Sequence, residues 1–281
     1  MTERFLICFC LFVTHFAMGQ GRITNSIGME FVLIESGAVV IGEFQPPYPV
    51  PNDTVKSLPH TYTMWMGDGR VYNEEEFKLA REMAMKDSQP GFSVMIEKPY
   101  YIATTEVTQG QWKKIMGYNP SVFQGTPGAD SLPVENVSWK EAQKFIKNLN
   151  RSEKCKSYRL PTEFEWEYAA RAGATKDIPW DEIQIAANLN KKTPINVASK
   201  KPNAWGLYDM LGNVWEWVDD YYNEKLFADP KPLRKGKQHV LKGASFVGDV
   251  KNATYMTHAG GPGNGWDVGF RIVKDVEIKS K

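Results

Sequence analysis

The sequence predicts one α+β domain with much irregular structure. Three helix starts carry capping boxes, in which a Ser or Thr is followed three residues later by Glu or Gln. Short apolar runs typical of strands stand before the helices and near the end, without the regular strand–helix alternation of a parallel sheet. The 281 residues include 23 glycines and 17 prolines, which favours a fold with many tight turns.

The composition is that of an ordinary globular protein. Hydrophobic residues make up 42% of the chain, charged residues 24%, and the formal net charge is +1. A charge so close to zero gives no general reason to expect nucleic acid or an anionic membrane as a partner. We therefore expect no nucleic-acid ligand.

Residues 1–19 are predicted to be a signal peptide. An apolar run over 5–16 is followed by the small-x-small sequence Ala-Met-Gly at 17–19, so Gln20 becomes the expected new N-terminus. The run is too short to span a membrane, and no later segment reaches 18 apolar residues. We expect a secreted or periplasmic protein in which Cys155 is the remaining cysteine.

The mature chain, 20–281, is predicted to be a single domain with an insertion at about 44–98. Two apolar runs within 27–42 are separated by Ser-Gly and indicate a β-hairpin. A proline-rich loop follows, and 73–87 has the acidic first turn and apolar face of a surface helix. The insertion is too short and too rich in proline to bury a core of its own.

The helices follow the capping boxes in order. These pair Thr108 with Gln111, Ser138 with Glu141, and Thr162 with Glu165. The second helix carries one apolar stripe, formed by Trp139, Ala142, Phe145, Ile146 and Leu149. Gly173 is the predicted C-cap of the third. Short strands are predicted at 100–106 and 240–246.

Residues 205–222, WGLYDMLGNVWEWVDDYY, form the densest run of the chain. They hold three of the nine tryptophans and four acidic residues, without a helical or alternating period. Large rings belong in a core, whereas carboxylates among them must be solvated, paired or bound to a cation. The spacing leaves two interpretations open, a metal-braced segment and a core segment whose acids face water.

Several motifs together resemble one known family. In order they are IGMEFVLI, YYIATTEVTQGQW, LPVENVSWKEAQKFIKNLN, YRLPTEFEWEYAARAG, GLYDMLGNVWEW, VLKGASF and VGFRIV. This set is similar to the formylglycine-generating-enzyme, or sulfatase-modifying-factor, domain from about residue 27 to 273. The resemblance implies an α+β fold with little regular secondary structure, a core like that of C-type lectins, and bracing by calcium.

The resemblance also implies which reaction to expect, and the residues depart from it. Family enzymes oxidise a sulfatase cysteine with two copper-binding cysteines, three and eight residues after the serine of a GGS motif. Here the serine is Ser245, and the two positions hold Gly248 and Ala253. Because soft thiolates are the natural Cu(I) ligands, we expect neither copper nor that oxidase activity.

The remaining residues near this motif are candidates for a rebuilt pocket. The candidates are Ser245, Asp249, His258, Trp266 and Arg271. A Ser245–His258–acid triad is one alternative chemistry, and a zinc or iron site built from the histidines is another. A simpler interpretation makes Ser245 a turn or pocket residue and His258 a residue of the pocket rim.

Calcium is the cofactor that the resemblance implies. Carried over onto this sequence, the ligands are Asp209, the carbonyls of Gly212 and Val214, and Glu216. Mixed carboxylate and carbonyl oxygens are the donors that calcium takes. The family's second site would begin at Asn188 and Leu189, but the loop 190–203 has no acidic residue, so we expect that site to be incomplete or absent.

The sequence thus predicts a calcium-braced binding or scaffold module without cysteine-oxidase activity. The ligand, whether protein, peptide or glycan, is not specified by the sequence. An alternative is an oxidoreductase-type enzyme of the same family with chemistry that does not use a copper–cysteine centre. A further one is a sulfatase-modifying enzyme that uses Cys155, which would require that thiol beside Ser245.

Overall fold

The structure, a computed structural model, confirms the α+β class. It describes residues 21–44, 89–125, 127–178, 180–227, 230–249, 253–261 and 263–277. The predicted signal peptide, the predicted helix at 73–87 and most of the predicted insertion lie outside these ranges. None of the helices in the described ranges has the length and apolar character needed to cross a membrane.

The largest sheet has five strands in the order β1-β2-β5-β11-β6. These are β1 Arg22–Thr24, β2 Glu30–Ile34, β5 Tyr100–Ala103, β11 Val273–Asp275 and β6 Tyr158–Arg159. All neighbours run antiparallel, and the register places Ile102 opposite both Val32 and Val273. The first and last strands of the domain therefore meet in one sheet.

A second sheet has four strands in the order β10-β7-β8-β9. They are β10 Val268–Gly269, β7 Trp215–Tyr221, β8 His239–Lys242 and β9 His258–Gly261. Part of the aromatic run 205–222 is thus a regular strand, although its sequence lacks a period of two. The consecutive residues Glu216, Trp217 and Val218 are all buried, so both faces of the strand are covered. A strand that is buried on both faces has no alternation of polar and apolar residues.

The predicted hairpin at 27–42 is wrong in its pairing. Both strands exist, but β3, Gly37–Phe44, pairs with β4, Gln89–Ile96, in a separate two-stranded sheet. The reason is that both edges of β2 are already occupied, by β1 and by β5. The part of the predicted insertion that the structure describes therefore includes β4, a partner of the preceding strand.

The three capped helices are confirmed. They are α4 Gln109–Met116, α5 Trp139–Ser152 and α6 Glu163–Arg171, each with both hydrogen bonds of its capping box. Four residues of the predicted stripe of α5 are buried, and the fifth, Trp139, is partly buried against the same cluster. At the end of α6 the left-handed C-cap is Ala172, one residue earlier than predicted, and Gly173 continues the turn.

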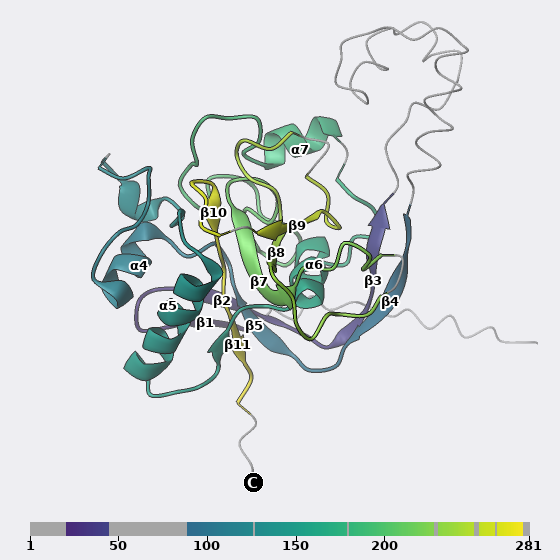
Figure 1. The fold of residues 1–281 in the computed structure, drawn as a ribbon, viewed down its shortest axis with the longest axis horizontal. Helices are drawn as coiled ribbons and strands as arrows, with labels where there is room; N and C mark the ends of the chain where they lie inside the picture. Colours follow the sequence, from purple (N-terminus) through teal and green to yellow (C-terminus); the bar gives the residue numbers. More distant parts are fainter. Residues whose placement is uncertain are drawn as a thin grey trace, which may run out of the picture.

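The elements pack around two contiguous hydrophobic clusters. One joins β2 and β5 to α6 and the loop before β7, and the other joins α4 and α5 to β8 and β10. Figure 1 shows α4 and α5 on one side, the β3–β4 hairpin on the other, and β7, β8 and α6 between them. The short helix α7, Trp180–Ala186, and the 3-10 turn Ala129–Ser131 complete the elements.

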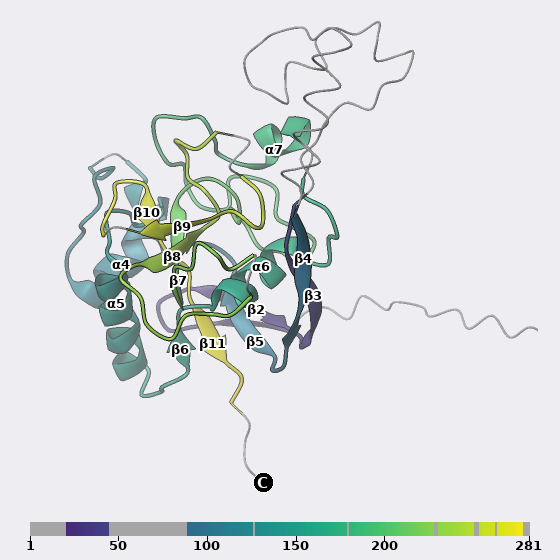
Figure 2. The same cartoon turned by 45° about the vertical axis from the view of Figure 1, so that its right-hand side comes forward.

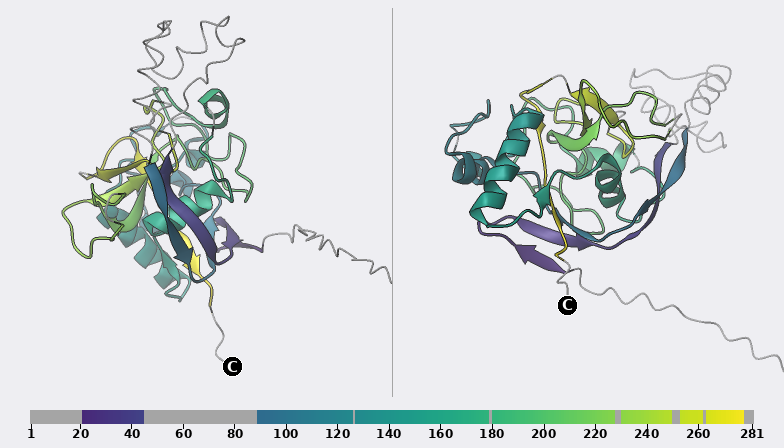
Figure 3. Two further views of the ribbon diagram at one scale, coloured as in Figure 1. Left: turned by 90° about the vertical axis from the view of Figure 1, so that its right-hand side faces the viewer. Right: turned by 60° about the horizontal axis from the view of Figure 1, so that its bottom comes forward.

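Other views show how the layers lie. In Figure 2, α7 stands above the strands, near the upper end of the β3–β4 hairpin. In the right-hand view of Figure 3, the strands at the start of the domain pass beneath the helices and the central sheet. The loop between α7 and β7 packs in one hydrophobic cluster with Ile183 of α7. It carries the predicted calcium ligands except Glu216, which lies in β7.

Candidate functional site

The loop before β7 turns sharply where the predicted calcium ligands stand. Asp209, Gly212 and Asn213 all have left-handed backbone angles, with φ of 54°, 82° and 57°. At Gly212 an added Cβ would lie 2.7 Å from the carbonyl oxygen of Asn188, so the close approach requires glycine. The turn packs Gly212 and Asn213 against the backbone of Asn188.

Three carboxylates gather beneath this turn, and we call them the acid cluster: Glu106, Asp209 and Glu216. Their exposed fractions are 0%, 6% and 0%. Burial raises the pKa of Glu106 well above its usual range, and the charges of Asp209 and Glu216 raise it further. Burial also raises the pKa of Asp209, against the backbone hydrogen bond from Ala198. The cluster therefore holds carboxyl groups where water does not solvate them, so that their ionised forms are costly unless a cation meets them.

Arg271 neutralises one member of the cluster. Its Nε donates to Oε2 of Glu216 and its Nη2 to Oε1, both over 2.6 Å. Oε2 also accepts a hydrogen bond of 2.7 Å from the indole of Trp166. Both oxygens of Glu216 therefore already have protein partners, and Arg271, wholly buried, serves this ion pair.

Glu106 is left only partly satisfied. Its Oε1 accepts a hydrogen bond of 3.1 Å from Nδ2 of Asn213, whereas its buried Oε2 has no partner. An unpaired buried carboxylate oxygen costs free energy unless a proton or a cation meets it. The sequence interpretation missed Glu106; its only signal was an acid at the end of a predicted strand, before buried Val107.

The donors at this place fit calcium in chemistry. They are hard oxygens from carboxylates and from a loop with carbonyls, and three carboxylates face one guanidinium, which leaves an excess of negative charge. In the described part of the chain, no three His, Cys, Asp or Glu side chains converge to hold a metal by themselves. A calcium ion here would therefore need the carbonyls of Gly212 and Val214 beside Asp209.

Asn188 and Leu189, the residues of the second predicted calcium site, make contacts within the protein that hold the loop after α7 in place. Nδ2 of Asn188 donates to the carbonyl oxygen of Thr193 over 3.1 Å, and the carbonyl of Asn188 accepts from the N–H of Asn213 over 3.0 Å. Leu189 is buried in the core. Asn188 thus ties the loop after α7 to the turn that carries the acid cluster.

The loop after β8 holds the positions at which the family has cysteines. Ser245 is fully buried, and its hydroxyl donates to Oδ2 of Asp267 over 2.7 Å. Gly248 lies in a turn in which its N–H donates to the Ser245 carbonyl, and an added Cβ would lie 3.0 Å from that oxygen. Ala253 is 3% exposed and packs within the core.

The other four predicted pocket residues, His258, Asp249, Trp266 and Arg271, do not converge on Ser245 as one group. Nδ1 of His258 is 2.8 Å from Oε1 of Glu163, at the end of the second sheet. Asp249 is exposed in the loop after Ser245. Trp266 is 46% exposed and its ring contacts those of Phe123 and Phe246. Trp266 and Ser245 are thus near neighbours, because Phe246 and Asp267 link them, while Arg271 and His258 serve separate ion pairs.

Cys155 follows α5, where its thiol donates to Oδ1 of Asn150 over 3.3 Å. The same amide group receives the N–H of Tyr158 and donates to its carbonyl, which fixes the link from α5 to β6. The observed contacts give Cys155 a place beside the second hydrophobic cluster.

Fold and site together define a domain of the formylglycine-generating-enzyme type, with a left-handed turn before a tryptophan-rich strand, and with a loop around Ser245 that carries no thiols. Comparison with known proteins agrees: residues 29–276 match the family model described as "Sulfatase-modifying factor enzyme 1-like domain". The chain belongs to this family.

The similar proteins in this family carry names that describe different activities. "Chaperone protein LppX" of Paenibacillus barcinonensis is 27% identical, over 73% of this chain and 91% of the relative. A "Formylglycine-generating enzyme" of Streptomyces coelicolor is 29% identical, over 75% and 73%. Among solved structures, PvdO from Pseudomonas aeruginosa shares the fold with a TM-score of 0.66 at 23% identity, covering 92% of this chain and 98% of PvdO.

Proposed function

We propose that this protein is a secreted, calcium-braced binding or scaffold module that does not perform copper-dependent cysteine oxidation. The observation that carries the proposal is the serine loop, where Gly248 and Ala253 stand at the positions of the family's thiols. Ala253 is buried in the core, and Ser245 is engaged by Asp267. A loop without thiolates lacks the ligands that Cu(I) requires.

The calcium part of the proposal is supported by the acid cluster. Asp209 and the carbonyls of Gly212 and Val214 would hold the ion together with the unpaired Oε2 of Glu106. Glu216, the further ligand that the resemblance implies, already has both oxygens bound by Arg271 and Trp166. Calcium bound there would offset the like charges and fix the turn before β7. A chaperone among the relatives supports a role in this family other than oxidation.

Two measurements on the full mature chain test the proposal. Oxygen consumption with a cysteine-containing sulfatase peptide and Cu(I) should be absent, with an authentic formylglycine-generating enzyme as the positive control. Metal analysis of the purified protein should find calcium alone. Turnover of the peptide overturns the non-catalytic assignment, and stoichiometric iron or copper that disappears on His258→Ala favours the alternative enzyme.

Calcium itself should raise the melting temperature relative to protein in a chelator. An ion at 100 times its dissociation constant adds about 2.7 kcal/mol to the free energy of unfolding. Asp209→Asn removes one charge and should weaken this effect, whereas Asp130→Asn, at an exposed position, should leave it unchanged. Identical melting curves with calcium and with chelator would show that calcium does not stabilise this protein.

A further inference from the structure

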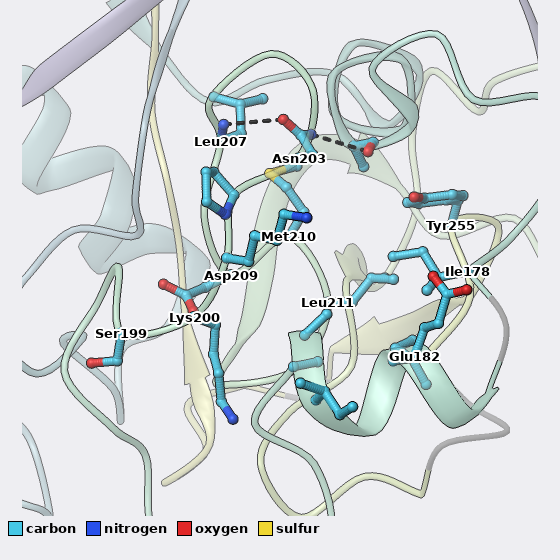
Figure 4. A pocket seen from close by; sticks show the side chains of 17 residues that line it. Ile178, Glu182, Ser199, Lys200, Asn203, Leu207, Asp209, Met210, Leu211 and Tyr255 are labelled. Carbon is cyan, nitrogen blue, oxygen red and sulfur yellow. Dashed lines mark hydrogen bonds between the residues drawn. The ribbon is translucent and has the colours of Figure 1, made fainter.

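A cavity of about 540 Å³ lies between α7 and the loop that leads to the acid cluster. Its apolar walls come from buried side chains of both elements and of the serine loop, namely Ile183, Leu207, Met210, Leu211 and Tyr255. Figure 4 labels Leu207, Met210, Leu211 and Tyr255 among the side chains that line the cavity. The volume falls within the roughly 300–1,000 Å³ of sites for small molecules. None of the five predicted pocket residues lines it.

The wall formed by the loop is held in place by Asn203. Its Nδ2 donates to the carbonyls of Ala169 and Ala170 at the end of α6, over 2.9 and 3.1 Å. Its Oδ1 accepts from the N–H groups of Trp205 and Leu207, over 3.0 Å each. Because all these groups are satisfied within the protein, the cavity is preformed and a ligand need not pay to order it.

Charged groups stand on the rim. Lys200 and Lys201 come from the loop, and Glu182 comes from α7. Figure 4 places Lys200 and Glu182 on opposite sides of the hollow. Among the residues that the structure describes, no carboxylate forms an ion pair with either lysine. The lysine side of the rim therefore offers two ammonium groups to a ligand.

Asp209 also belongs to the wall, and its charge bears on the ligand. Its Oδ2 accepts a hydrogen bond of 2.8 Å from the N–H of Ala198. The inference rests on the proposed function in one respect, because calcium held by Asp209 would neutralise a carboxylate that lines the same cavity as the lysines. At the mouth, Ile185 is 77% exposed and extends the apolar surface outward.

From these observations we infer that the cavity binds a small molecule with an apolar body and one anionic head. The apolar body fills the space between α7 and Leu207, Met210 and Leu211. The head, a carboxylate or a similar anion, lies beside Lys200 and Lys201, where it gains charge-assisted hydrogen bonds. Burial of the body supplies most of the affinity, and the lysines select the sign of the charge.

Three probes that share one alkyl chain separate these contributions: decanoate, decanol and decylammonium. Each is titrated into the full mature chain with calcium by isothermal calorimetry. Decanoate should bind at one saturable site, decanol more weakly, and decylammonium most weakly. Equal affinities for all three, or no saturable binding of decanoate, would overturn the inference.

Two variants and a control locate the site. Ala186→Phe fills the cavity from the end of α7 and should weaken decanoate binding by about tenfold or more, the equivalent of about 1.4 kcal/mol. Lys200→Glu, at the rim, should reverse the preference between decanoate and decylammonium. Lys192→Glu changes an exposed lysine that does not line the cavity and should change neither.

The outcomes for cavity and calcium remain distinct. If both cavity variants retain wild-type decanoate affinity, the site is elsewhere and the inference fails. Repeating the titration in chelator separates the two proposals. If calcium does not change the melting temperature but decanoate still binds, the calcium proposal alone is wrong. If calcium raises the melting temperature but decanoate does not bind, the proposed cavity ligand alone is wrong.

Discussion

Two groups of buried charges lie in the core, and their charge balance differs. The acid cluster, Glu106, Asp209 and Glu216, has three carboxylates facing the single guanidinium of Arg271. The second group, which we call the lysine cluster, pairs two carboxylates with two permanent cations and a histidine: Glu163, Glu167, Arg171, Lys242 and His258. The ion pairs of the second group thus balance two carboxylates with two cations, whereas the first group has three carboxyl groups for one cation.

The hydrogen bonds follow the same difference. In the lysine cluster, Oε1 of Glu167 accepts from Arg171 and from the N–H of Gly42, and Oε2 accepts from Lys242 over 3.1 Å. In the acid cluster, Oε2 of Glu106 has no partner. The balanced group is complete as a structural element, whereas the unbalanced one leaves a buried carboxylate oxygen without a partner. Charge balance, and not the number of acids, separates a structural cluster from a candidate metal site.

The largest expected effect tests the claim that the lysine cluster is complete. Lys242→Met removes a fully buried cation and leaves Glu163 and Glu167 short of a partner. Breaking a buried pair from one side costs about 3–5 kcal/mol of unfolding free energy, measured by denaturant titration. Lys113→Ala, which breaks the exposed pair with Asp130, should cost about 0–1 kcal/mol. Equal losses would show that the cluster is not a closed ion network.

A substitution in the acid cluster is expected to have a smaller effect, and to stabilise the calcium-free protein where Lys242→Met destabilises it. Glu106→Gln keeps the shape and removes a buried carboxyl whose raised pKa makes its ionised form costly. At pH values where that carboxyl would ionise, the calcium-free protein should therefore gain about 1–3 kcal/mol of unfolding free energy. The same substitution should diminish the additional stability that calcium gives. Thermal melts in calcium and in chelator measure both quantities. Destabilisation of the calcium-free form would mean that Glu106 is already compensated.

The smallest effect concerns the border of the lysine cluster, where Asp220 accepts the N–H of Glu163 over 2.6 Å. Burial raises the pKa of Asp220 to about 6; this hydrogen bond opposes the rise, and the charges of Glu163, Asp219 and Glu165 add to it. A carboxyl whose folded pKa lies above its unfolded value of about 3.9 binds its proton more tightly when folded. The stability it contributes is therefore present below about pH 4 and is lost as the pH rises through about 6.

Asp220→Asn should flatten this part of the pH dependence. Melting temperatures measured between about pH 4 and pH 7 should fall with rising pH less steeply in the variant than in the wild type. Asp130→Asn, an exposed control, should leave the slope unchanged. An unchanged slope in Asp220→Asn would assign the pH dependence to other groups.

The local features of this protein are largely determined by its sequence. Each capping box closes over three residues, so the starts of α4, α5 and α6 can be predicted without knowing the rest of the fold. The left-handed turn around Gly212 and the vacated thiol positions, Gly248 and Ala253, can likewise be read from short motifs.

Only the tertiary structure decided which distant groups meet. Glu106 and Asn213 are separated by 107 positions and Arg271 and Glu216 by 55, and no local pattern links them. The pairing of β3 with β4 was decided in the same way, since β1 and β5 already occupied both edges of β2. Hydrogen bonds and ion pairs form between groups that the fold brings into contact, whatever their separation in the sequence. The turns and caps were therefore determined by short stretches of sequence. The charge clusters and the cavity were determined by the packing of distant segments.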